Sequence, residues 1–233
     1  MKTVGIIGGI APESTIQYYR LIIQSYRERK RDGSYPSIII NSIDMKKMLD
    51  LIAANELANV TEYLVGEVKR LASAGADFGL LASNTPHIVF DAIRQQSPIP
   101  LISIVEATCL ATRVLELKKV GLFGTRFTMQ GGFYSRVLAR EKITLVTPNA
   151  DEQTYIHDKY MSELVNGIFL EETRTRLLAI VERMKKQEAI QGLILGGTEL
   201  PFVLNTNDMD RQAIPFLDTT KIHAEQAVTR MLL

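Results

Sequence analysis

Hydroxyl, amide and imidazole groups come together directly after an apolar segment, in Ser83-Asn84-Thr85-Pro86-His87. Hydroxyl and amide groups can hold a carboxylate through hydrogen bonds. Ser, Asn and Thr before a proline are also typical of the first turn of a helix, and both roles can hold at once. The four-residue spacing of Ser83 and His87 is compatible with a hydroxyl–imidazole pair.

A second polar loop, residues 196–201 with the sequence Gly-Gly-Thr-Glu-Leu-Pro, follows another apolar segment. It includes Gly197, the hydroxyl group of Thr198 and the carboxylate of Glu199. A carboxylate in this place could tune a neighbouring group that transfers a proton. The alternative is that Glu199 is a surface acid in a turn.

Two further loops are expected to join a strand to a helix. In residues 8–15, Gly9 and Ser14 belong to a turn whose backbone N–H groups could hold a carboxylate or phosphate. The alternative is a tight turn that needs glycine for its backbone angles. The loop lacks both the G-x-G-x-x-G dinucleotide pattern and the Lys of a P-loop.

Residues 124–129 offer two hydroxyl groups and a guanidinium group, on Thr125, Thr128 and Arg126. These groups suit an acidic ligand. The alternative is an ordinary turn with a solvated Arg126. His157 lies in a helical stretch and is expected to be structural, as is His223. No Cys, His or acidic spacing in the sequence indicates a metal site.

The elements that must position these loops alternate along the chain, apolar strands with amphipathic helices. Strands are expected at residues 4–7, 37–41, 78–82 and 100–104, and helices at residues 14–30, 57–73, 87–95 and 107–117. This alternation predicts βα units on parallel sheets, and so an α/β fold.

The pattern then repeats with nearly constant spacing. Residues 120–125 echo 4–9 at an offset of 116, residues 195–199 echo 81–85 at 114, and residues 215–218 echo 100–103 at 115. The repeat predicts two similar doubly wound lobes with mostly parallel sheets, residues 1–105 plus about 215–233 and residues 106–214. We expect a pseudo-twofold relation, with a cleft between the lobes that the strand-end loops face.

Composition limits the classes of function. The chain has 233 residues with 27 basic and 26 acidic side chains. This balance gives no basic surface for nucleic acid or membrane. A single cysteine, Cys109, excludes an internal disulfide and fits a reducing compartment. The apolar run at the N-terminus stops at Gly8, too early for a signal peptide, so a cytoplasmic location is expected.

Several motifs together resemble the aspartate/glutamate racemase family along essentially the whole chain. They are the opening MKTVGIIGG-x-x-x-EST, SNTPH, GTRFTM, the DE-x-x-x-x-IH-x-x-x-x-x-EL-x-x-G stretch over residues 151–167, GGTE and the ending DTTKIHAEQAV. The resemblance implies a homodimer that needs no cofactor and acts on a small carboxylic or amino acid. It also implies proton transfer by two thiols, one in a C-N-T motif and one in a G-C-T-E motif.

The two thiol positions of the family correspond here to Ser83 and Gly197. A serine hydroxyl is a far poorer base than a thiolate, and glycine has no side chain, so the two-thiol mechanism cannot operate unchanged. His87 and Glu199 are the titratable groups nearest the loops and become the replacement acid/base candidates. The alternatives are a cofactor-free lyase or decarboxylase and a non-catalytic binder of a small dicarboxylate.

Overall fold

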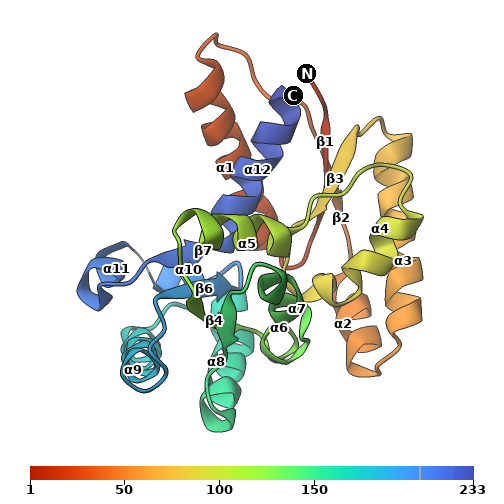
Figure 1. Ribbon diagram of the computed structural model, residues 1–233. Coiled ribbons are helices and arrows are strands. Elements are labelled where there is room, and N and C mark those ends of the chain that lie inside the picture. Colours follow the sequence, from red (N-terminus) through yellow and green to blue (C-terminus); the bar gives the residue numbers. More distant parts are fainter. Residues whose placement is uncertain (205) are drawn as a thin grey trace. The chain divides into compact units, whose positions relative to one another are not determined.

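The computed structural model describes residues 1–204 and 206–233, without the side chains of residues 206, 207 and 210. The chain forms two compact units, Met1–Ile104 with Thr220–Leu233, and Val105–Thr219. Each unit has a parallel sheet with helices (Figure 1), which confirms the predicted α/β class. The pseudo-twofold relation and the cleft stay predictions.

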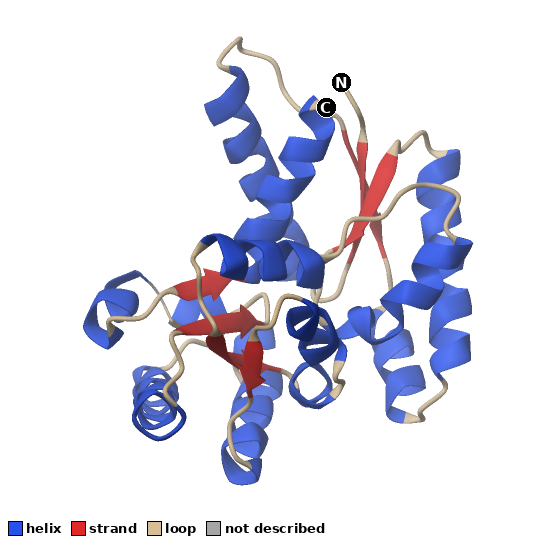
Figure 2. Ribbon diagram, viewed as in Figure 1, coloured by secondary structure: helices blue, strands red, loops and turns tan. Residues whose placement is uncertain are grey.

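The first unit is built on a three-stranded sheet of order β2-β1-β3, in which both pairings are parallel (Figure 2). Its strands are β1 (Val4–Gly8), β2 (Ile38–Ser42) and β3 (Phe78–Leu81). Its helices are α1 (Pro12–Lys30), α2 (Met45–Ala53), α3 (Leu57–Ser73), the 3₁₀ helix Thr85–Val89, α4 (Phe90–Gln96) and, from the end of the chain, α12 (Thr219–Leu232).

The strand predicted at residues 100–104 is wrong as a full strand. The segment makes one isolated parallel bridge, from Leu101 to Gly79, and helix α5 (Ile104–Val114) already begins at Ile104. Proline at 98 and 100 removes two backbone donors there, which shortens the possible ladder.

The second unit has a four-stranded sheet of order β5-β4-β6-β7, also parallel throughout. Its strands are β4 (Lys119–Gly124), β5 (Thr144–Val146), β6 (Gly192–Gly196) and β7 (Phe216–Asp218). Its helices after α5 are α6 (Arg126–Gln130), α7 (Phe133–Arg140), α8 (Ala150–Ser162), the 3₁₀ helix Leu164–Asn166, α9 (Glu171–Glu188), α10 (Leu200–Val203) and α11 (Thr206–Gln212). Every helix in the described ranges is too short or too polar to cross a membrane.

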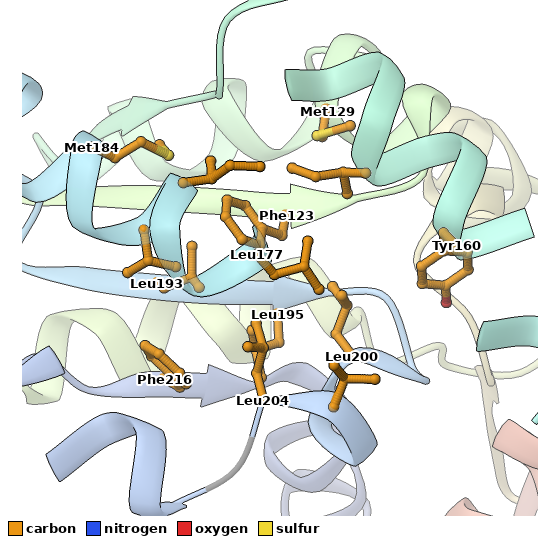
Figure 3. Packing of buried hydrophobic residues seen from close by; sticks show 14 of the residues in the cluster. Phe123, Met129, Tyr160, Leu177, Met184, Leu193, Leu195, Leu200, Leu204 and Phe216 are labelled. Atoms are coloured by element: carbon orange, nitrogen blue, oxygen red, sulfur yellow. The ribbon is translucent and has the colours of Figure 1, made fainter. Parts of the chain in front are cut away.

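Each sheet carries its own apolar core. In the first unit, Val4 and Ile6 of β1 pack with Tyr18 of α1 and Val228 of α12. In the second, strands β4 and β6 pack against α8 and α9 (Figure 3). Tyr160 of α8 belongs to this second core and lies beyond the carboxyl ends of the strands.

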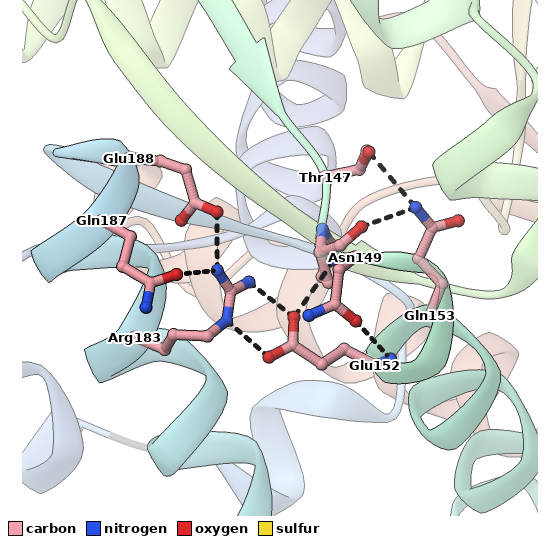
Figure 4. Close-up of polar contacts among 8 residues, drawn as sticks. Thr147, Asn149, Glu152, Gln153, Arg183, Gln187 and Glu188 are labelled. Atoms are coloured by element: carbon pink, nitrogen blue, oxygen red, sulfur yellow. Dashed lines mark hydrogen bonds and ion pairs between the residues drawn. The ribbon is translucent and has the colours of Figure 1, made fainter.

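An ion pair joins the two helices of the second core (Figure 4). The guanidinium group of Arg183 in α9 donates to both carboxylate oxygens of Glu152 in α8, each at 2.5 Å. The same carboxylate closes the capping box of α8, because it accepts from the backbone N–H of Asn149 at 3.1 Å. Glu152 is only 8% exposed, so these partners replace the water that its carboxylate would otherwise contact.

Replacing this arginine should therefore destabilise the second unit. We expect Arg183→Met to lower the free energy of unfolding by roughly 2–4 kcal/mol, because a carboxylate largely removed from water loses its bidentate partner. Lys186→Met is the matched control in the same helix. Lys186 pairs with Glu182 at 3.3 Å with its side chain 73% exposed, so we expect a change below about 0.5 kcal/mol. Urea unfolding measures both, and equal effects would contradict the prediction.

Candidate functional site

The loop after β3 buries Ser83, Asn84, Thr85 and His87. The imidazole Nδ1 of His87 lies 3.0 Å from the backbone carbonyl oxygen of Ser83, so the ring contacts the main chain of Ser83. The other ring nitrogen, Nε2, accepts the backbone N–H of Ile104 at 3.2 Å. The predicted hydroxyl–imidazole pair is therefore wrong, since the main chain is the partner of both nitrogens.

These contacts fix the protonation of His87. Because Nε2 accepts, the proton sits on Nδ1 and is donated to the Ser83 carbonyl. Burial, followed by the nearby His223, lowers the pKa of His87 to about 3. A neutral ring with both nitrogens bonded to backbone is suited to hold the loop in place, in contrast to the predicted acid/base role.

A second buried histidine, His223 of α12, supports the same segment. Its Nδ1 accepts the hydroxyl group of Tyr18 at 2.8 Å, and its Nε2 lies 3.1 Å from the carbonyl oxygen of Ile102. Burial lowers the pKa of His223 to about 4. The two histidines thus bind the main chain on either side of residue 103, which agrees with the structural role predicted for His223.

The loop after β1 uses its polar groups internally. Gly9 has φ +82, the left-handed region that favours glycine, and its N–H donates to the Thr15 hydroxyl at 2.8 Å. The Ser14 hydroxyl lies 2.7 Å from the carbonyl oxygen of Ala11 and 3.2 Å from that of Ala82. The contact with Ala82 ties this loop to the start of the β3 loop, so Gly9 and Ser14 shape the loops.

The loop after β6 carries the most concentrated polar group of the second unit. Tyr160 of α8 donates its hydroxyl hydrogen to Glu199 Oε2, and Thr198 Oγ1 lies 2.8 Å from the same oxygen. All three residues are buried, so Glu199 is not the surface acid of the alternative interpretation. Burial and the charge of Glu199 raise the pKa of Tyr160 well above its usual value, which keeps the phenol protonated.

Tyr160 is a residue that the sequence analysis missed. An ideal Cβ built on Gly197 would lie 2.9 Å from both Cζ and the hydroxyl oxygen of Tyr160. The tyrosine ring therefore takes the space that a side chain at 197 would need. The signal in the sequence was a glycine at a family cysteine position together with a tyrosine in the resembling stretch 151–167.

The loop after β4 supports the turn interpretation more directly than ligand binding. Thr125 caps α6, and its hydroxyl oxygen accepts the backbone N–H of Thr128 at 3.3 Å. The backbone N–H of Arg126 donates to Nδ1 of His157 at 3.2 Å. The methyl group of Thr128 lies 3.1 Å from the place that a Cβ on Gly196 would take, so this loop lies close to the start of the β6 loop.

Each unit thus gathers its predicted residues at one sheet edge. Gly9, Ser14 and the 83–87 loop meet at the carboxyl ends of β1 and β3, while Thr125–Thr128 and the 197–199 loop meet at those of β4 and β6. This is the edge at which open parallel sheets bind ligands. Among the described residues, no group of three or more His, Cys, Asp or Glu could hold a metal ion.

Comparison with known proteins shows which family and which solved structures this chain resembles. The family model for Asp/Glu/hydantoin racemases matches residues 7–227. A candidate Asp/Glu racemase from Yersinia pestis is 32% identical with a TM-score of 0.91, and an aspartate racemase homologue from Pyrococcus horikoshii OT3 is 32% identical with a TM-score of 0.86. Both comparisons cover 100% of both chains.

A curated relative is also an amino-acid racemase. The broad specificity amino-acid racemase RacX of Bacillus subtilis (strain 168) is 24% identical over 240 residues, which cover 98% of each chain. The match of the family model over most of the sequence and the 32% identity to two solved structures lead to one assignment. This chain belongs to the Asp/Glu/hydantoin racemase family.

Proposed function

We propose that this protein is a cofactor-independent relative of amino-acid racemases that binds an aspartate- or glutamate-like acid through the loops after β3 and β6. The observation that carries the proposal is the buried Tyr160–Thr198–Glu199 group at the loop that resembles the second thiol motif. A polar group buried at this edge of the sheet suits a small charged ligand. The named relatives, an amino-acid racemase and an aspartate racemase homologue, support the ligand class.

The binding groups follow from the chemistry of the loops. Hydroxyl, amide and guanidinium groups hold carboxylates, and the chain supplies them at both sheet edges. We assign them to Ser83, Asn84, Thr85, Thr125, Arg126, Thr128 and Thr198. Gly9 and Ser14 contribute by shaping the loop after β1.

Proton transfer is where this chain departs from its family. Ser83 is a poor base, and Gly197 offers only backbone. Of the two replacement candidates, His87 uses both ring nitrogens in hydrogen bonds to the main chain. Glu199 is therefore the candidate that remains for proton transfer. A single carboxylate that takes the α-proton of an amino acid and returns it acts on one face, so the product keeps its handedness.

The unmodified protein is therefore expected to bind aspartate or glutamate at millimolar concentration without racemising it. Calorimetry measures binding, while NMR in D₂O and chiral chromatography measure α-proton exchange and inversion. We expect slow exchange or none, and inversion roughly 10²-fold or more below that of a thiol-bearing relative. Fast racemisation would overturn the proposal, and Glu199→Gln would then show whether Glu199 is the base.

The second candidate is a non-catalytic binder of a small dicarboxylate. It is favoured by the two main-chain hydrogen bonds of His87, because a site that lacks both thiols and has its nearest imidazole bonded to backbone can still bind an acid. Succinate or malonate binding more tightly than aspartate, with no exchange, would favour it. The homodimer implied by the resemblance and the cytoplasmic location expected from the sequence belong to the same proposal.

A further inference from the structure

The space above Gly197 is closed by a side chain. An ideal Cβ at this position would lie 2.9 Å from Tyr160 Cζ and closer still to Cε2, whereas real Cβ atoms essentially never approach other atoms within 3.0 Å. Gly197 has no positive φ, unlike Gly9. Lack of space, and not a left-handed backbone, is therefore what requires glycine here.

The ring of Tyr160 is held firmly where it lies. Tyr160 is 5% exposed and belongs to the apolar core of the second unit with Leu164 and Leu200. Its hydroxyl donates to Glu199, which also accepts from Thr198. Moving the ring aside to admit a side chain at 197 would break a buried hydrogen bond and open the core.

We propose that Tyr160 takes the place of the residue-197 side chain and presents its phenol oxygen, oriented by Glu199, as the acceptor that the ammonium group of a small amino acid meets at this loop. This assignment rests on the proposed function. It makes Tyr160 a specificity-determining residue, because the ring replaces a compact thiol by a bulky hydrogen-bonding group. It also couples Gly197 and Tyr160 energetically, so that a substitution at either position alone is expected to lower the stability of the protein.

The coupling is tested by stability alone. Gly197→Ala should lower the midpoint of thermal unfolding by about 5 °C or more in the native background, because overpacking a dense core is destabilising. The same loss is expected in the Tyr160→Phe background, which keeps the ring carbons. In the Tyr160→Leu background the loss should largely disappear. Gly66→Ala is the control, since a Cβ there meets nothing within 4 Å.

The role of the phenol is tested by binding. Tyr160→Phe should weaken aspartate binding about 10-fold in calorimetry, the effect of one hydrogen bond. Arg183→Met also lowers stability but lies elsewhere in the unit, so it should bind aspartate as the native protein does. Unchanged binding by Tyr160→Phe would overturn the phenol's role, and equal Gly197→Ala losses in all three backgrounds would overturn the coupling. Absence of aspartate binding by the native protein would instead refute the proposed function and leave the coupling standing.

Discussion

The triple variant Ser83→Cys/Tyr160→Leu/Gly197→Cys is expected to racemise aspartate or glutamate at least about 10²-fold faster than the unmodified chain. One thiolate would take the α-proton, with the C–H electron pair delocalised into the substrate carboxylate. The other thiol would donate a proton to the opposite face and become the thiolate. A thiol titrates near 8.5, so a useful fraction is ionised at mildly alkaline pH, whereas a serine hydroxyl is not.

The structure shows why the variant must include Tyr160→Leu. Cysteine at 197 in the native background would place its Cβ against the Tyr160 ring, so Ser83→Cys/Gly197→Cys is expected to be destabilised and nearly inactive. Ser83→Cys/Tyr160→Leu/Glu199→Gln, which lacks both the second thiol and the Glu199 carboxylate, serves as the one-base control. Chiral chromatography with NMR in D₂O should show α-proton exchange without inversion for this control. A triple variant that folds, binds aspartate and remains inactive would contradict the two-thiol interpretation.

The sequence was most informative where a residue acts through its neighbours along the chain. Alternation of apolar and amphipathic segments was enough to predict parallel sheets, because strand and helix periodicities are local. The four loops lie at the carboxyl ends of β1, β3, β4 and β6 for the same reason. The error at residues 100–104 was also local, since an apolar run between prolines can form a single bridge as readily as a strand.

Contacts between distant residues were beyond local patterns. His87 and Ser83 have suitable spacing for a side-chain pair. In the folded chain, however, the imidazole Nε2 accepts a hydrogen bond from the backbone N–H of Ile104. Likewise, Tyr160 reaches Gly197 from another element, and only their packing reveals why the glycine is there. The candidate site could therefore be located from the sequence, while the state of its acid/base groups required the structure.

The stability of the protein is expected to fall as the pH drops from 7 to 5, by on the order of 4 kcal/mol. The cause is the pair of buried histidines, His87 with a pKa of about 3 and His223 with a pKa of about 4, against about 6.5 for an unfolded chain. Below pH 6.5 the unfolded state takes up protons that the folded state cannot accept. The free energy of unfolding then declines by up to about 1.4 kcal/mol per pH unit for each histidine, and it is flat above pH 7.

The groups around the two rings explain why protonation is resisted. Charging His87 would turn Nε2 into a donor facing the N–H of Ile104. Charging His223 would turn Nδ1 into a donor, so that the Tyr18 hydroxyl would lose its acceptor there. The ring centroids lie 6.4 Å apart, and Arg94 adds a further positive charge that lowers the pKa of His87. If both rings were protonated, two like charges would lie close together in a buried region. Desolvation by burial is the largest cause of the lowered pKa of each histidine.

Urea unfolding at pH 7.5, 6.5, 5.5 and 5.0 measures this dependence in a window above the titration of most carboxylates. His223→Gln removes one titrating ring, so the slope between pH 6.5 and 5 should fall by about half even though the variant starts less stable. His157→Gln is the control, because His157 is only partly buried. A native slope near zero, or a slope unchanged by His223→Gln, would mean that water or a rearranged segment 102–104 accommodates the charge and that the two histidines do not hold it as neutral rings.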